Sequence, residues 1–214
     1  MNQRNRTDRA FYEMVVIAGL MLLSVLFVPS ALGLLSILPI IYVFVERRVR
    51  HRTKESIGFK RKRLYQDLLS VLPTFLLVSF ALPVAYFFIF TYSSPALLEH
   101  IEKRVDILSA FNGAWPLAIL LFALGEEIVF RGLIQARLNW KMRPAYAIVL
   151  SSILFSVMHL TEGSSVVVTV DLATIFLDSI LFGCLFFRTN NLYISWLAHA
   201  LANLTGAFLL FFFL

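Results

Sequence analysis

Residues 113–136 read GAWPLAILLFALGEEIVFRGLIQA, and this stretch decides the fold class. It is long and apolar enough for one membrane-spanning helix, which needs roughly 20 mostly apolar residues. It also contains Glu126, Glu127 and Arg131. A charged side chain at the centre of a membrane helix costs roughly 2.5–3.5 kcal/mol on insertion scales. We therefore expect these three side chains to face the interior of a helical bundle, where they can find partners.

Further apolar segments predict an all-α, polytopic membrane bundle of about seven transmembrane helices. Pro73 and Pro83 lie in the third predicted span and are expected to bend it. Residues 92–112 instead predict one amphipathic helix on the membrane surface, which either caps the bundle or gates entry to a site. No repeat or linker indicates a second domain, so residues 1–214 are expected to form a single integral membrane domain. The predicted spans are residues 11–28, 30–45, 64–91, 113–136, 145–162, 166–187 and 191–214.

The composition agrees with a membrane protein and excludes several other classes. Hydrophobic residues make up 59% of the chain and charged residues 15%, whereas soluble domains contain roughly 45–50% apolar residues. A disordered chain, a nucleic-acid-binding arm and a typical soluble enzyme do not have this composition. We expect no nucleic-acid partner, although the net charge is +6. The single cysteine, Cys184, excludes a disulfide framework and a Cys-based zinc site.

The distribution of basic residues predicts the orientation in the membrane. In a seven-span topology 16 of the 19 Lys and Arg residues fall on one side, nine of them between residues 47 and 63. The positive-inside rule then places the N-terminus in the cytoplasm and the C-terminus outside. We expect the segment 46–63 to anchor this topology, and binding to anionic lipid head groups is compatible with it. The expected location is the lipid bilayer of a plasma membrane, in a bacterium.

Polar or aromatic side chains recur at helical spacing in three of the predicted spans. Residues four positions apart share one face of a helix, so three helices can converge on one pocket. Glu126 is rotated by about 100° from its neighbour on the helix and has no partner at this spacing in its own span. The pairs are Glu127 with Arg131, Phe155 with His159, and His199 with Asn203.

This set of side chains is suited to hydrolysing an amide bond. Two neighbouring carboxylates do not both ionise easily, and one of them can then act as a general base. Arg131 would keep Glu127 ionised, while a histidine beside Glu126 would orient and deprotonate a water molecule. The second histidine and the asparagine are donors suited to a developing oxyanion. Hydrolysis by this route requires no serine or cysteine nucleophile.

A structural interpretation of the same residues stays open beside the catalytic one. Glu127 and Arg131 alone would form a buried ion pair that fixes the helix register. The two histidines and Asn203, each taken alone, would be interhelical hydrogen-bond partners. Two carboxylates of the sixth span remain candidates: Asp171 is expected to cap the helix start, and Asp178 to pair with Arg131 or to line a water path.

The three motifs, in this order along the chain, resemble those of the CPBP family, the CAAX proteases and bacteriocin-processing enzymes, also called the Abi family. The resemblance covers about residues 113–206, the expected catalytic core. It implies an intramembrane endopeptidase acting on peptides or membrane-associated proteins. By this resemblance Glu126 and His159 activate the catalytic water, and His199 and Asn203 stabilise the oxyanion. The motifs are Glu126-Glu127-x-x-x-Arg131, Phe155-x-x-x-His159 and His199-x-x-x-Asn203. The remaining residues would support the site: Glu127, Arg131 and Phe155.

Zinc is the one cofactor that the pattern leaves open. Glu126, His159 and His199 are legitimate zinc ligands, and names in this family often include the word metalloprotease. However, the sequence lacks the His-Glu-x-x-His pairing that places two ligands one turn apart. The type II CAAX prenyl endopeptidases that the motifs resemble are described as metal-independent. We therefore expect no metal and no other cofactor.

Two further functions are alternatives to a protease. The first is a non-catalytic immunity or scaffold protein of the same family, in which the motif residues form a structural polar core. The second is a proton-coupled transporter, because intramembrane Glu, Asp and His side chains also form proton relays. We find no inverted repeat and no pair of Gly- or Pro-broken helices, which disfavours transport.

Overall fold

The computed structural model describes residues 3–28 and 32–213, which are almost entirely helical and contain no β-strand. Residues 30 and 31 of the second predicted span, and residue 214 of the last, lie outside these described residues. The predicted all-α class is confirmed. The helices are α1 (Gln3–Phe27), α2 (Leu32–Val49), α3 (Leu64–Ser70), α4 (Leu72–Leu76), α5 (Leu82–Ser93), α6 (Pro95–Val105), α7 (Trp115–Glu127), α8 (Ala136–Leu138), α9 (Pro144–Val157), α10 (Ser165–Thr189) and α11 (Leu192–Phe213).

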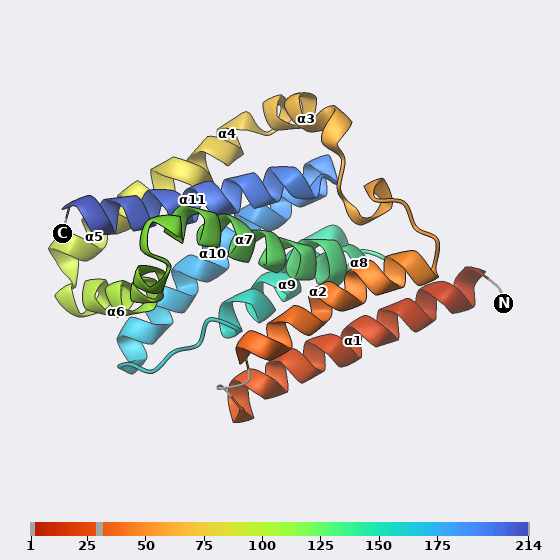
Figure 1. The fold of residues 1–214 in the computed structure, drawn as a ribbon, viewed down its shortest axis with the longest axis horizontal. Helices are drawn as coiled ribbons and strands as arrows, with labels where there is room; N and C mark the ends of the chain where they lie inside the picture. The colour runs from red at the N-terminus through yellow and green to blue at the C-terminus, as the bar shows by residue number, and fades with distance from the viewer. Residues whose placement is uncertain (1–2, 29–31, 214) are drawn as a thin grey trace.

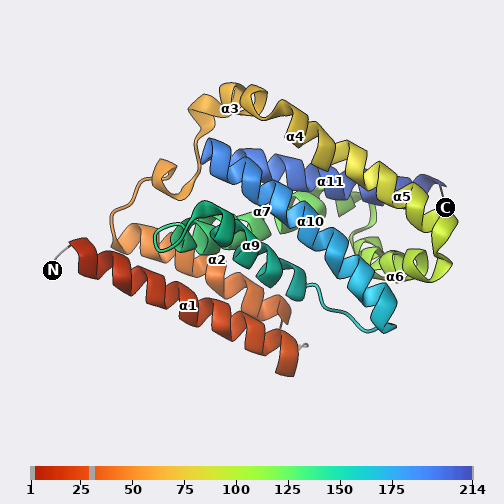
Figure 2. The ribbon, with the colours of Figure 1, turned by 180° about the vertical axis from the view of Figure 1, so that it is seen from behind.

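Most of the long helices lie roughly along the long axis of the molecule (Figure 1). Helices α1 and α2 form one side of the bundle, and α3, α4 and α5 form the other. Figure 2 shows the same arrangement from behind, with α7, α9, α10 and α11 between these two sides. The three predicted motifs lie on elements of this central group, so the fold places them in the interior.

Apolar helices show that the chain is an integral membrane protein. Within residues 3–28 and 32–213, four helices are long and apolar enough to cross a membrane, or five if one pair bent by 58° counts as a single span. The predicted number of seven is therefore not confirmed. The four are Asp8–Phe27, Leu72–Ser93, Ser165–Thr189 and Leu192–Phe213, and the bent pair is Pro95–Val105 with Leu108–Leu138.

The second and fifth predicted spans do not reach the length and apolarity of a membrane-crossing helix, for different reasons. Helix α2 carries Glu46, Arg47 and Arg48 near its end, so its apolar part is brief. Helix α9 has only 14 residues and ends at Val157, so the predicted end at residue 162 was wrong. At 1.5 Å per residue it is about 21 Å long, against about 30 Å for the hydrocarbon core.

Prolines divide the third predicted span, as expected. Pro73 lies in the first turn of α4, directly after the non-helical Val71, so its missing N–H costs no helical hydrogen bond. Pro83 lies in a helix that continues without a break into α5, so it cannot donate to the carbonyl oxygen of Ser79 four residues earlier. Between them lies the π-helical segment η4 (Leu77–Ala81). There the carbonyl oxygen of Ser79 accepts a hydrogen bond from Thr205 Oγ1 of α11 at 3.0 Å. The bent span is thus held against α11.

The predicted amphipathic helix is present as α6. Its start is capped by Ser94, whose side-chain oxygen accepts a hydrogen bond from the backbone N–H of Leu97 at 3.3 Å. Three residues of its apolar face, Leu98, Ile101 and Val105, line an internal cavity. The helix therefore covers part of the bundle interior, while its position relative to a membrane surface stays a prediction.

Gly183 permits close packing where α10 meets α9 and the segment that follows α7. A Cβ atom at this position would lie 2.9 Å from Gln135 Oε1 and 3.0 Å from Ile148 Cγ2. We expect Gly183→Ala to lower the free energy of unfolding by about 1–3 kcal/mol, because overpacking forces its neighbours apart. Thermal unfolding in detergent micelles measures this change. Gly19→Ala is the control, since nothing lies within 4 Å of its added Cβ, and an equal effect of both variants would contradict the prediction.

Candidate active site

The two adjacent glutamates lie where the backbone changes its helical type. Helix α7 ends at Glu127, and the π-helical segment η6 (Ile128–Gln135) follows, with all but one of its residues buried. A π-helix adds one residue to a turn and occurs frequently at functional sites. The spacing of the polar residues does not predict this change from an α-helix to a π-helix.

Glu127 and Arg131 form the predicted pair in the core of the bundle. The Glu127 carboxylate is fully buried, and its Oε2 lies 3.4 Å from Arg131 Nε. Arg131 also donates hydrogen bonds from Nη2 to the carbonyl oxygen and the hydroxyl of Ser179, at 2.8 and 3.0 Å. Ser179 was missed in the sequence, where it is one small polar residue in an apolar span. Arg131 therefore does not pair with Asp178, and that expectation was wrong.

His199 is held in a defined orientation by this buried pair. Its Nδ1 lies 3.0 Å from Glu127 Oε1, and its ring stacks on Phe182 with centroids 4.6 Å apart. A carboxylate paired with a guanidinium acts as a hydrogen-bond acceptor, so Nδ1 must carry the proton. In the neutral ring, Nε2 then presents a lone pair on the opposite side.

The ring of His159 also carries its proton on Nδ1, but for a different reason. Its Nδ1 lies 2.8 Å from the carbonyl oxygen of Phe155, which can only accept a hydrogen bond. The backbone N–H of His159 bonds instead to Ser156, so α9 ends here and His159 lies in the following turn. Again Nε2 of the neutral ring presents a lone pair away from the helix.

Both Nε2 atoms point at the carboxylate of Glu126. Oε2 of Glu126 lies 3.5 Å from Nε2 of His199, and Oε1 lies 3.9 Å from Nε2 of His159. The Glu126 side chain is 34% exposed, whereas that of Glu127 is 0% exposed. Of the two glutamates, only Glu126 is therefore accessible to a substrate or to a water molecule, whereas Glu127 contacts His199.

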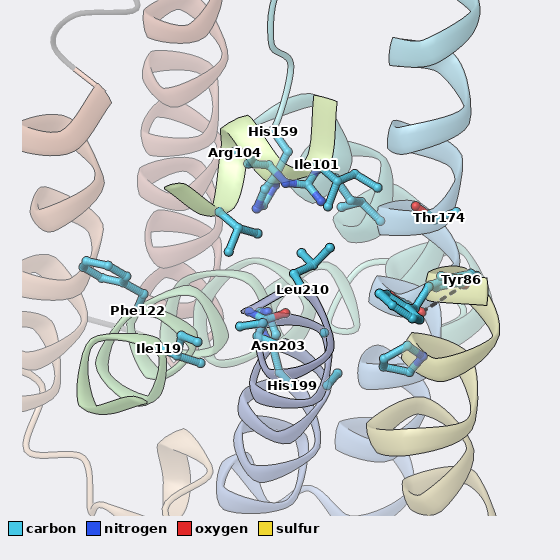
Figure 3. A pocket seen from close by; sticks show the side chains of 18 of the residues that line it. Tyr86, Ile101, Arg104, Ile119, Phe122, His159, Thr174, His199, Asn203 and Leu210 are labelled. Carbon is cyan, nitrogen blue, oxygen red and sulfur yellow. Dashed lines mark hydrogen bonds between the residues drawn. The ribbon is translucent and has the colours of Figure 1, made fainter. Parts of the chain in front are cut away.

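These side chains lie at the wall of a cavity of about 310 Å³. Glu126, Phe155, His159, His199 and Asn203 all contribute to its lining, and Figure 3 shows the labelled members of this group around it. Most of the other lining residues are apolar and come from α5, α6, α7, α10 and α11. The structure thus brings the predicted site residues of three separate segments to one apolar chamber, with Glu127 and Arg131 buried behind it.

The predicted zinc ligands do not fit a metal ion as they are placed. Across residues 3–28 and 32–213, no group of three His, Cys, Asp or Glu side chains is arranged to hold one. The expectation that the protein needs no metal stays a prediction. The mechanism proposed below uses only side chains and water.

Asp171 has a different role from the predicted one. Helix α10 begins two turns earlier, with Ser164 as its N-cap, so Asp171 does not cap it. Its carboxylate is instead buried and accepts two hydrogen bonds of 2.6 Å from Arg104 of α6. His100 Nε2 lies 3.4 Å from the same carboxylate. These contacts fasten α6 to α10 beside the cavity.

The fold and the site define a class: an integral membrane protein with a glutamate–histidine cluster open to an internal cavity. Residues 109–205 match the model of a protein family described as type II CAAX prenyl endopeptidase Rce1-like. This match includes every residue of the three motifs and is consistent with the CPBP family that they resemble. No curated protein and no solved structure matches the chain. The matched family is generally one of proteases.

Proposed function

We propose that the protein is an intramembrane endopeptidase that hydrolyses peptide bonds of peptides or membrane-associated proteins. One observation carries this proposal: the Glu126 carboxylate faces the Nε2 atoms of His159 and His199 at the wall of an apolar cavity. A carboxylate and a neutral imidazole on one accessible site can accept both protons of a water molecule. The family match of residues 109–205 supports the same reaction.

In the first step, a water molecule binds between Glu126 and His159. The Nε2 lone pair of His159 accepts one of its protons as a hydrogen bond, and Glu126 removes the other as general base. The water oxygen then forms a bond with the carbonyl carbon of the substrate. The π electrons of the carbonyl group move to its oxygen, which becomes an oxyanion.

In the second step, the oxyanion is stabilised by Asn203 and His199. The amide of Asn203 donates a hydrogen bond, and His199 donates another when Nε2 has received a proton from Glu126. Glu127 accepts a hydrogen bond from His199 Nδ1 in both steps and so keeps the ring of His199 in its orientation. The oxyanion then re-forms the carbonyl group as the C–N bond breaks, and His199 Nε2 delivers the proton taken from water to the leaving amine, which completes hydrolysis and returns both side chains to their starting forms.

The experiment that tests this proposal is cleavage of a pooled library of membrane peptides by the purified protein in lipid vesicles. The library contains prenylated and unprenylated members, and a parallel sample contains a chelator. We expect the wild-type protein to cut and the Glu126→Gln protein not to cut. Sensitivity to the chelator would overturn the metal-free mechanism. Equal cutting by both proteins would remove Glu126 from the mechanism and leave the motif residues as a structural polar core.

Asn203 provides a separate test of the second step. Asn203→Ala removes one oxyanion donor, and losses of this kind lower kcat by about 10²- to 10³-fold. We expect KM to change little, because the donor acts mainly on the transition state. Steady-state kinetics on one cleaved library peptide measure both constants. A large rise in KM with an unchanged kcat would instead place Asn203 in ground-state binding.

We also infer that the protein lies in a bacterial plasma membrane with its N-terminus in the cytoplasm. In support, the basic segments gather at one end of the bundle. Lys141 pairs with Asp8 of α1, and Arg137 Nη1 donates a hydrogen bond to the carbonyl oxygen of Ala10 at 2.8 Å. Arg137 also lies 3.2 Å from Glu46 of α2. Cysteine labelling of each terminus in intact cells tests this orientation.

A further inference from the structure

A second carboxylate, Asp178, lines the same cavity as Glu126 but has no part in the mechanism above. It lies on α10, one turn before Phe182, and the ring of Phe182 stacks on His199. Asp178 therefore lies close to the reacting groups. It faces a space in which a bound substrate would be placed.

Among the described residues, the carboxyl group of Asp178 is hydrogen-bonded without a cationic side chain in contact with it. Tyr86 of α5 donates a hydrogen bond to its Oδ1 at 3.3 Å, which the dashed line at Tyr86 in Figure 3 marks. In the part of the chain that the structure describes, no Lys, Arg or His forms an ion pair with it. The protein thus supplies one neutral donor to a carboxylate at the wall of an apolar chamber.

Arg104 is the only Lys or Arg among the described residues that line the cavity, and it is already engaged. Its Nη1 donates to both carboxylate oxygens of Asp171 at 2.6 Å, and Asp171 is 1% exposed. The two remaining cavity groups that could carry positive charge, His159 and His199, face Glu126. The basic side chains that line the cavity are thus engaged elsewhere, and none of those described contacts the Asp178 carboxyl group.

A carboxylate in apolar surroundings is unfavourable unless a cation or several donors compensate it. We propose that Asp178 is a specificity-determining residue that binds a Lys or Arg side chain of the substrate close to the scissile bond. This inference rests on the proposed function, because it places a peptide in the cavity. The ammonium or guanidinium group would complete the hydrogen bonds of Asp178, and the aromatic walls around Tyr86 would contact the aliphatic part of the side chain.

The experiment has two readouts on the same pooled peptide library. In the first, mass spectrometry counts residue types on either side of each cut made by the protein in lipid vesicles. In the second, the library is passed over immobilised Glu126→Gln protein in lipid nanodiscs, and the retained peptides are sequenced. The second readout needs no turnover, so it tests binding even if the protein cuts nothing.

We expect Lys and Arg to be enriched over Leu and Met by about tenfold or more in both readouts. A tenfold preference corresponds to the lower end of the coupling energies measured for close charge pairs at protein interfaces. Asp178→Asn should reduce the enrichment to about one, and Asp178→Lys should favour Asp and Glu. Tyr86→Phe removes the hydrogen bond from Tyr86 to Asp178 but keeps the Asp178 side chain, so the variant should keep the preference for Lys and Arg. Glu99→Gln, on the outer surface of α6, is the matched control.

Three results would overturn the inference. The first is an absence of basic enrichment with the wild-type Asp178, and the second is enrichment that persists in Asp178→Asn. The third concerns the hydrogen bond between Tyr86 and Asp178. Equal losses in Tyr86→Phe and Asp178→Asn would mean that Asp178 only holds the two helices together. Failure of the proposed function gives a different pattern, in which nothing is cut while basic peptides are still retained.

Discussion

Glu126→Gln is expected to lower kcat by about 10²- to 10⁴-fold, the contribution usual for general acid–base catalysis, while the protein remains folded. Glutamine has nearly the shape of glutamate but cannot accept a proton from water at neutral pH. The side chain is 34% exposed at the cavity wall, and it faces the imidazoles of His159 and His199 instead of a buried guanidinium as Glu127 does. The substitution should therefore remove chemistry without removing a core contact.

Single-turnover cleavage by equal amounts of folded protein measures this loss. Glu99→Gln is the control, because it makes the same chemical change at a side chain that is 64% exposed and paired with Lys103 on the surface. We expect it to cut at the wild-type rate. A Glu126→Gln protein that keeps more than about one tenth of the wild-type rate would exclude Glu126 as the general base.

Arg131→Met is expected to destabilise the fold by about 3–5 kcal/mol, the usual result of leaving one member of a buried ion pair alone. The carboxylate of Glu127 is 0% exposed and has Arg131 as its cationic neighbour at 3.4 Å. Methionine fills similar space but leaves that charge uncompensated. His199 would also lose its fixed orientation, because the same carboxylate holds its Nδ1.

Unfolding in detergent micelles compares this variant with Arg63→Met. Arg63 also faces a carboxylate four residues away, Asp67 at 3.7 Å, but its side chain is 70% exposed. Pairs with an exposed cation contribute about 0–1 kcal/mol, and the buried Asp67, 8% exposed, still accepts a hydrogen bond from Asn191 Nδ2 at 2.8 Å in this variant. The double variant of Glu127→Gln with Arg131→Met should recover most of the lost stability without recovering cleavage. Equal effects of Arg131→Met and Arg63→Met would refute a structural role for the buried pair.

The candidate site could be predicted from the sequence because its chemistry is carried by residues four apart on helices. The spacing of Glu127 and Arg131 correctly predicted their pairing. The spacing of Phe155 and His159 predicted a shared face, and the structure has a bond between the ring of His159 and the Phe155 carbonyl. Polar residues in apolar segments are conspicuous, since the bilayer excludes them unless they are buried together.

The remaining features depend on contacts between distant segments or on backbone geometry. The pair of Arg104 with Asp171 joins residues 67 positions apart, and that of Tyr86 with Asp178 joins residues 92 apart. Such pairs follow from tertiary packing, which no local pattern encodes. The early end of α9 was also hidden, because the apolar run continues past Val157 while the backbone turns to bring His159 to the cavity.

The shortness of α9 has a consequence for the depth at which a peptide could be cut. A helix of 14 residues is roughly 9 Å shorter than the hydrocarbon core. Although α9 is too short to be a candidate span by itself, a bilayer around it would thin locally, or polar groups and water would fill the difference. The turn that carries His159 would then lie at a local depression of the membrane. Water would have a short path to the reaction, and lipid chain length would set how readily the protein works.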